Sequence, residues 1–132
     1  MTPRRNRPDV TDAELTVLKA LWGRGASSIR ELTDLLYPEG GTAHYATVQK
    51  LLERLEAKAF VRRRQRGRIN IYSPVIEREA LIARRLRDTA DKLCEGSLTP
   101  LLTQLVEGSD LSRDELAALR RLVTRRRRDR ER

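Results

Sequence analysis

The spacing of the apolar residues changes near residue 60, and this change limits the folds that the chain can adopt. Before it, four apolar residues recur at the intervals of an amphipathic helix: Val48, Leu51, Leu52 and Leu55. After it, residues 69–72 alternate as a strand does, and Pro74 ends the stretch. Residues 62–68, between the two patterns, include five arginines and a glycine that favours a turn. The sequence therefore predicts a helix over about residues 44–59 and then a basic β-hairpin that turns at about residues 65–67.

Two earlier helices are predicted from two capping boxes, in which a hydroxyl residue precedes a glutamate by three positions. The first box, Thr11–Glu14, begins a helix that Gly23 and Gly25 end. The second box, Ser28–Glu31, begins a shorter helix whose apolar residues point toward a core: Ile29, Leu32, Leu35 and Leu36. Three helices followed by a basic hairpin form a winged helix-turn-helix. We therefore expect a mainly α fold of the α+β class.

Helical patterns return after the hairpin. One helix is expected over about residues 77–95, a short one around residues 101–106, and a last one from a third capping box at residues 112–115. These helices have too few residues to bury their own apolar faces well, so we expect a second copy of the chain to cover them. The predicted parts are a flexible basic arm (1–10), the winged helix-turn-helix (11–75), a helical dimerisation region (76–124) and a basic tail (125–132).

The charge is unevenly distributed over the 132 residues. Lysine and arginine number 28 against 19 acidic residues, a net charge of +9. The arm contributes +2, the tail +4 and the segment 62–68 +5, which leaves the remainder faintly acidic at −2. Such local excesses indicate a polyanionic partner, either nucleic acid or an acidic membrane surface.

Several classes of protein are disfavoured by the same residues. The chain is too short for a multi-domain enzyme, and it offers neither a paired base and nucleophile nor a phosphate-cradling loop. One cysteine and one histidine cannot build a closed zinc site, so no metal and no cofactor is expected. No apolar run approaches the roughly 20 residues of a membrane span, and no signal peptide is evident. We expect a soluble cytoplasmic protein that is not an enzyme.

The third predicted helix carries a polar stripe beside its apolar one. Thr47, Lys50 and Arg54 share this stripe, and in a helix-turn-helix such a side enters the major groove of DNA. Arginine bonds guanine bidentately, lysine suits a phosphate or guanine, and threonine contacts a phosphate or a thymine methyl. The alternative interpretation is an ordinary solvated helix face; the basic hairpin that follows favours DNA.

Three further basic features belong to the same hypothesis. Arg66 and Arg68, near the hairpin turn, are the expected phosphate contacts of a wing. His44 is interpreted as a helix-start residue near the phosphates and not as a catalyst. The run 125–128 has no apolar pattern and is interpreted chiefly as a solvated or frayed end.

The chain resembles the penicillinase repressors of the BlaI/MecI type, which are grouped with the copper-responsive CopY repressors. The resemblance is carried by the run Thr-Val-Gln-Lys-Leu-Leu-Glu-Arg-Leu-Glu-Ala-Lys at 47–58, by Gly67-Arg68 and by Tyr72-Ser73-Pro74. It implies a dimeric winged-helix repressor that binds a palindromic operator through its third helix. The DNA-contacting positions of the family correspond to Ala46, Thr47, Lys50, Arg54 and the wing residues 66–68, and Ala46 replaces the usual lysine.

The resemblance also bears on how repression ends. In antibiotic-responsive members, a membrane sensor protease leads to cleavage of an Asn-Phe bond in the C-terminal helices, and the matching residues here are Gln104 and Leu105. The copper-responsive branch needs a cysteine-rich motif that a single cysteine cannot supply. We therefore expect a repressor relieved by proteolysis or by loss of dimerisation after a cell-envelope or antibiotic signal.

Two other classes of function stay open at this point. A sequence-neutral DNA-coating protein of the nucleoid type would bind through the arm, the wing and the tail alone. A protein-interaction adaptor would keep the winged helix without binding DNA, and the arginine-rich wing argues against it.

Overall fold

The computed structural model describes residues 8–108 and 111–131, and these residues form two compact units that divide between Arg84 and Arg85. Residues 1–7 of the predicted arm lie outside the described residues. The last arm residue, Val10, is buried in the core, so the packed structure begins before the first capping box. Among the described residues, no helix combines the length and the apolar character that crossing a membrane requires.

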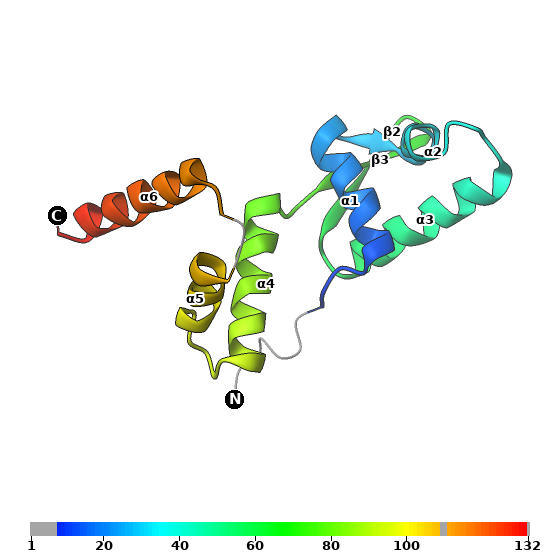
Figure 1. Ribbon diagram of the computed structural model, residues 1–132. Coiled ribbons are helices and arrows are strands. Elements are labelled where there is room, and N and C mark those ends of the chain that lie inside the picture. The colour runs from blue at the N-terminus through cyan, green and yellow to red at the C-terminus, as the bar shows by residue number, and fades with distance from the viewer. Residues whose placement is uncertain (1–7, 109–110, 132) are drawn as a thin grey trace. The chain divides into compact units, whose positions relative to one another are not determined.

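The N-terminal unit is a winged helix-turn-helix, as the sequence predicts (Figure 1). Its elements are α1 (Asp12–Arg24), β1 (Ser27–Ser28), α2 (Ile29–Leu36), α3 (Thr42–Ala57), β2 (Val61–Arg66), β3 (Ile69–Pro74) and the first turns of α4 (Arg78–Leu93). The strands form one antiparallel sheet in the order β1-β3-β2. The two-residue strand β1 was not predicted, because its serines carry no strand pattern.

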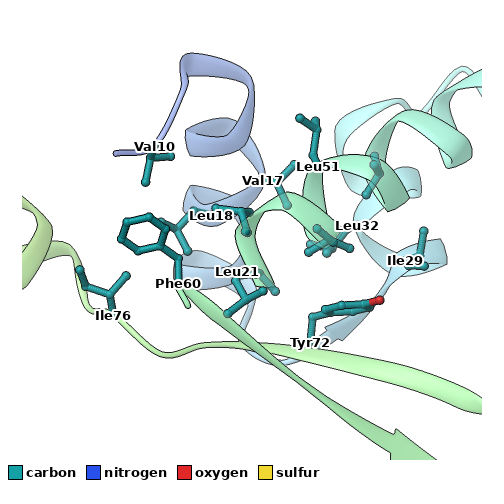
Figure 2. Close-up of a cluster of buried hydrophobic side chains, with 14 of the residues drawn as sticks. Val10, Val17, Leu18, Leu21, Ile29, Leu32, Leu51, Phe60, Tyr72 and Ile76 are labelled. Atoms are coloured by element: carbon teal, nitrogen blue, oxygen red, sulfur yellow. The ribbon is translucent and has the colours of Figure 1, made fainter. Parts of the chain in front are cut away.

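The core of this unit joins α1, α2 and α3 to the sheet (Figure 2), and Leu81 of α4 also belongs to it. Leu18, Leu21, Leu52 and Leu55 have no exposed surface, and Phe60 is buried beside them. Tyr72 of β3 lies against the same core, and burial raises the pKa of its hydroxyl. Leu35 was predicted to face this core but is 51% exposed, because the buried side of α2 runs through Leu32 and Thr33 instead.

A buried ion pair ties the start of α1 to the end of α3. The Glu14 side chain is only 1% exposed, and Lys58 Nζ lies 2.7 Å from its Oε1. The same carboxylate completes the first capping box by accepting from the Thr11 backbone N–H at 3.0 Å. Lys58 Nζ also donates to the carbonyl of Asp9 at 2.8 Å. Burial acts to raise the pKa of Glu14, but the Lys58 and Thr11 hydrogen bonds outweigh it and hold that pKa below its ordinary value.

The end of α3 departs from the predicted boundary. The helix stops at Ala57, and Ala59 takes a left-handed backbone conformation with φ of 66°. The Phe60 N–H donates to the carbonyl of Leu55 at 2.9 Å, which closes the helix end. Such a conformation costs roughly 1–2 kcal/mol for a residue other than glycine. Burial of Phe60, next in the chain, offsets this cost.

The C-terminal unit contains the rest of α4, then α5 (Thr99–Glu107) and α6 (Arg113–Glu131). The run 125–128, interpreted as a solvated or frayed end, is solvated but not frayed: α6 continues through it, and its side chains there are exposed. Many large apolar side chains of this unit face solvent, among them Leu86, Leu93, Leu98, Leu102, Leu105, Val106, Leu116, Leu122 and Val123.

The ion pair of Glu14 generates a prediction about stability. Replacing Glu14 by glutamine keeps a hydrogen-bond acceptor but leaves Lys58 without its charged partner, so the free energy of unfolding should fall by about 1–3 kcal/mol at neutral pH. Because the folded pKa of Glu14 is lowered, its contribution is complete above the ordinary value of 4.5 and is lost as the pH falls through the folded pKa. Urea unfolding followed by the fluorescence of Trp22 measures the free energy of unfolding of the wild type and of Glu14→Gln at each pH. The two free energies should differ at neutral pH and converge below pH 4.5.

The matched control is Glu31→Gln, which changes the same position of the second capping box. Glu31 pairs with Arg24 at 2.9 Å, but both side chains are more than two-fifths exposed, and exposed pairs contribute little. Equal losses in the two variants would show that burial of the Glu14 pair does not matter.

Candidate nucleic-acid interface

The two sides of α3 differ in burial as the sequence predicted. Val48, Leu52 and Leu55 are fully buried, whereas Thr47, Lys50 and Arg54 are exposed. Ala46 is exposed beside them. The buried side fixes the rotation of the helix, so the three polar residues form one outward stripe.

The two basic side chains of the exposed stripe are available to bind a ligand. Among the ion pairs found in the described part of the chain, none involves Lys50 or Arg54. The Thr47 hydroxyl donates to the carbonyl of Ala43 at 3.0 Å, and the side chain is exposed. Thr47 can therefore contact a thymine methyl or accept a hydrogen bond, but its proton is already used.

The first turn of α3 begins at Thr42, two residues earlier than predicted. His44 is half-buried, because its ring stacks on Tyr37 with centroids 4.0 Å apart and an angle of 5° between the planes. A Cβ added at Gly41, whose φ is +119°, would lie 3.2 Å from the His44 ring. This ring therefore packs the turn between α2 and α3, and contact of His44 with DNA stays a prediction.

The wing presents its arginines on two faces. In the β2–β3 register, Arg62 is opposite Ser73, Arg64 opposite Ile71 and Arg66 opposite Ile69, so these three arginines share one exposed face. Arg63 lies on the other face, where its Nε is 3.5 Å from Glu56 Oε2 of α3.

The wing turn consists of Gly67 and Arg68, slightly later than predicted, because Gln65 and Arg66 still pair with β3. Gly67 has a φ of 63°, which suits the first central position of a two-residue hairpin turn. The turn thus carries Arg68 at the tip of the wing, next to Arg66 at the end of β2.

Four residues near this interface were not predicted from the sequence. Arg30 of α2 lies over the ring of Tyr45 of α3, with its Cζ 5.3 Å from the ring centroid. Both residues line a groove of about 300 Å³, together with Gln49 and Asn70. Side chains from α2, α3 and β3 meet here, and the crossing of these elements cannot be derived from residue spacing. The only sequence signal was a basic residue in the first turn of α2.

The predicted cleavage position lies inside α5. Gln104 and Leu105 are both exposed, and the Gln104 carbonyl accepts the N–H of Gly108 at 3.0 Å. Both residues line an apolar groove of about 470 Å³ with Leu86, Leu98, Leu101 and Leu102. Within the described residues, no three His, Cys, Asp or Glu side chains gather as metal ligands would.

Comparison with known proteins gives relatives along most of the chain. The penicillinase repressor of Bacillus licheniformis is 26% identical over 116 residues, which cover 88% of this chain and 90% of that protein. The methicillin resistance regulatory protein MecI of Staphylococcus aureus (strain N315) is 23% identical over 117 residues, or 89% of this chain and 94% of that one.

Two solved structures also match part of the chain. The DNA binding domain of the repressor BlaI is 28% identical with a TM-score of 0.48. The monomeric form of Bacillus licheniformis BlaI, in complex with the blaP half-operator, is 30% identical with a TM-score of 0.46. Each match covers 56% of this chain and 89% of the other.

The family model described as penicillinase repressor matches residues 10–125. This match includes the winged helix-turn-helix and almost all of the C-terminal helices. The chain therefore belongs to the penicillinase repressor family, whose members are transcriptional repressors and not enzymes.

Proposed function

We propose that this protein is a DNA-binding repressor that acts in the cytoplasm and binds a two-fold symmetric operator as a homodimer. The observation that carries the proposal is the outward stripe of α3, in which Lys50 and Arg54 stand exposed and without acidic partners among the described residues. The stripe lies on the helix that a helix-turn-helix inserts into the major groove.

Each residue of the stripe has a role suited to its chemistry. Arg54 bonds O6 and N7 of a guanine, and Lys50 contacts a phosphate or a guanine. Thr47 packs its methyl group on a thymine, because its hydroxyl proton is engaged by Ala43. Ala46 has a short side chain, so it contacts a base pair less closely than a longer side chain would.

The wing supplies affinity that depends little on sequence. Arg66 and Arg68 lie at its tip with no carboxylate partner among the described residues, so their guanidinium groups can bind backbone phosphates. Arg63 is less available, because it pairs with Glu56.

The C-terminal unit is proposed to hold two copies together. Its exposed leucines form an apolar groove of about 470 Å³, and a soluble monomer rarely leaves such a surface uncovered. Linking two DNA-binding units makes the second half-site contact intramolecular, which raises affinity far above that of one unit.

Derepression is proposed to follow from loss of this linkage. Cleavage between Gln104 and Leu105, by a membrane sensor protease responding to a cell-envelope or antibiotic signal, would remove α6 and part of α5. The bond lies within a helix, so α5 must open locally before a protease can hold the chain in an extended form. Separation of the dimer without cleavage would have the same effect on operator affinity.

The first test concerns Arg54. In Arg54→Ala, affinity for a duplex selected from random sequences by the intact protein should fall by about 1–3 kcal/mol, and discrimination should relax at one base position of each half-site. Gel-shift titrations of single-base variants measure both effects. The control is Lys19→Ala, an exposed cation of α1, which should leave discrimination unchanged. If the intact protein binds random duplex as well as any selected one, the sequence-neutral coating protein is the better description.

The second test concerns the wing. Arg66→Ala should weaken binding to all duplexes alike and lower the slope of log affinity against log salt by about one, because one phosphate contact is lost. Arg63→Ala, on the opposite face of the same strand, should change this slope less. A slope that Arg66→Ala leaves unaltered would remove the wing tip from the interface.

The third test concerns the dimer. Leu102→Asp places a charge in the apolar groove, so the protein should sediment as a monomer and its affinity for the full operator should fall toward that for a half-site. The control is Thr103→Asp, since Thr103 is exposed and does not line the groove. A monomeric wild-type protein, or a dimer that survives Leu102→Asp, would contradict this role of the C-terminal unit.

A further inference from the structure

A groove of about 300 Å³ lies between the wing turn and the helices α2 and α3. It is lined by Ser28, Ile29, Arg30, Tyr45, Gln49, Arg68, Ile69 and Asn70. Two of these side chains are arginines, two are amides and none is a carboxylate. The groove therefore has positive charge and several hydrogen-bond donors, which are the groups that bind an oxyanion.

The Arg30 side chain is placed so that it can bind a ligand. It is exposed, its Cζ lies 5.3 Å from the centroid of the Tyr45 ring, and no ion pair among the described residues involves it. Stacking on an aromatic ring restricts a guanidinium while leaving its N–H edge free to bind. Tyr45 thus positions the guanidinium group of Arg30 for binding.

The groove continues past this pair. A second groove of about 370 Å³ is lined by Arg30, Tyr45, Gly41 and Thr42, at the start of α3. Arg30 and Tyr45 line both grooves. An extended ligand that follows the two grooves therefore passes from the wing tip to the first turn of α3. A nucleic-acid backbone has the extended form and the repeated charge that fit such a path.

We propose that Arg30, positioned by Tyr45, and Arg68 of the wing turn bind one backbone phosphate of DNA from opposite sides of this groove. The inference rests on the proposed function, since it assigns the phosphate that lies between the α3 contacts and the wing contacts. Arg30 contacts the ligand itself, whereas Tyr45 is a positioning residue. Gln49 and Asn70 supply amide donors to the same phosphate or to its neighbour.

The first experiment measures salt dependence. Arg30→Ala should lower the slope of log affinity against log salt by about 0.9, which corresponds to an affinity loss of about fivefold near 0.15 M salt. Discrimination among base sequences should stay unchanged. The matched control is Arg78→Ala, because Arg78 also lies over an aromatic ring, 5.4 Å from the Trp22 centroid, but lines neither groove.

The second experiment locates the phosphate. Duplexes that carry one neutral methylphosphonate each, scanned along the selected site, should weaken binding of the wild-type protein at several positions. At one position beside the half-site, Arg30→Ala should be insensitive, because the contact is already absent. If wild-type and Arg30→Ala proteins lose affinity equally at every position, Arg30 binds no phosphate and the proposal is overturned.

The third experiment separates positioning from folding. Tyr45→Phe keeps the ring and should bind like the wild type, whereas Tyr45→Leu should lose part of the Arg30 contribution and become less sensitive to the same methylphosphonate. Urea midpoints from Trp22 fluorescence report whether either variant is unfolded. Equal binding by Tyr45→Leu and Tyr45→Phe would remove the positioning role.

Two remaining outcomes are distinct from these. If inorganic phosphate binds the wild type but not Arg30→Ala, and DNA affinity at equal ionic strength is the same in phosphate as in chloride, the groove is a site for free phosphate, and the assignment to the DNA backbone fails. If the wild-type protein prefers no duplex over random sequence, the proposed function fails first, whatever the behaviour of Arg30.

Discussion

The burial of one side of α3 is the constraint on which the rest of the interface depends. Val48, Leu52 and Leu55 have no exposed surface, and burying side chains of this size contributes roughly 1.5–3 kcal/mol each. Rotation of the helix would expose them and bury Lys50 and Arg54, which have no described acidic partner to neutralise them. The packing that stabilises the unit therefore also orients the exposed stripe of α3 toward solvent, and no further interaction is needed to orient it.

The same helix sets the position of the wing. Lys58, directly after α3, reaches back to the buried carboxylate of Glu14, and Phe60 then enters the core. Ala59 between them is forced into its left-handed conformation by these two anchors. Strand β2 starts one residue after Phe60, and Arg63 pairs with Glu56 of α3. Helix and wing are thus joined by contacts on both sides of a short connection.

The sequence predicted those features that depend on neighbours along the chain. Capping boxes marked the starts of α1 and α2, and the change in apolar spacing located the wing, because caps and periodicity are local properties. Prediction from the sequence failed where a residue distant in the chain determines the local conformation. Ala59 was placed in the helix, since only the burial of Phe60 and the Glu14–Lys58 pair reveal why the helix ends earlier.

The interface was predicted in part for the same reason. The stripe of Thr47, Lys50 and Arg54 follows from the period of a single helix, and the structure exposes all three residues. The pair of Arg30 and Tyr45 does not follow, because it depends on how α2 crosses α3. His44 was assigned to the phosphates from its position at the helix start, and this contact stays a prediction. Its stacking on Tyr37 could not be predicted, because no local pattern links the end of α2 with the start of α3.

The net charge of +9 takes on a different meaning once the side chains are located. Five arginines in 62–68 do not act as one cluster, because strand alternation turns Arg63 toward Glu56 and leaves Arg62, Arg64 and Arg66 on the other face. Long-range attraction to DNA depends on the total charge, but register depends on which guanidinium groups are held in place. Arg30 lies over the Tyr45 ring, which restrains its side chain before binding, whereas no such ring contact among the described residues involves an arginine of α6. In the proposed complex, ordering Arg30 on DNA therefore costs less side-chain entropy than ordering an exposed arginine of α6 would.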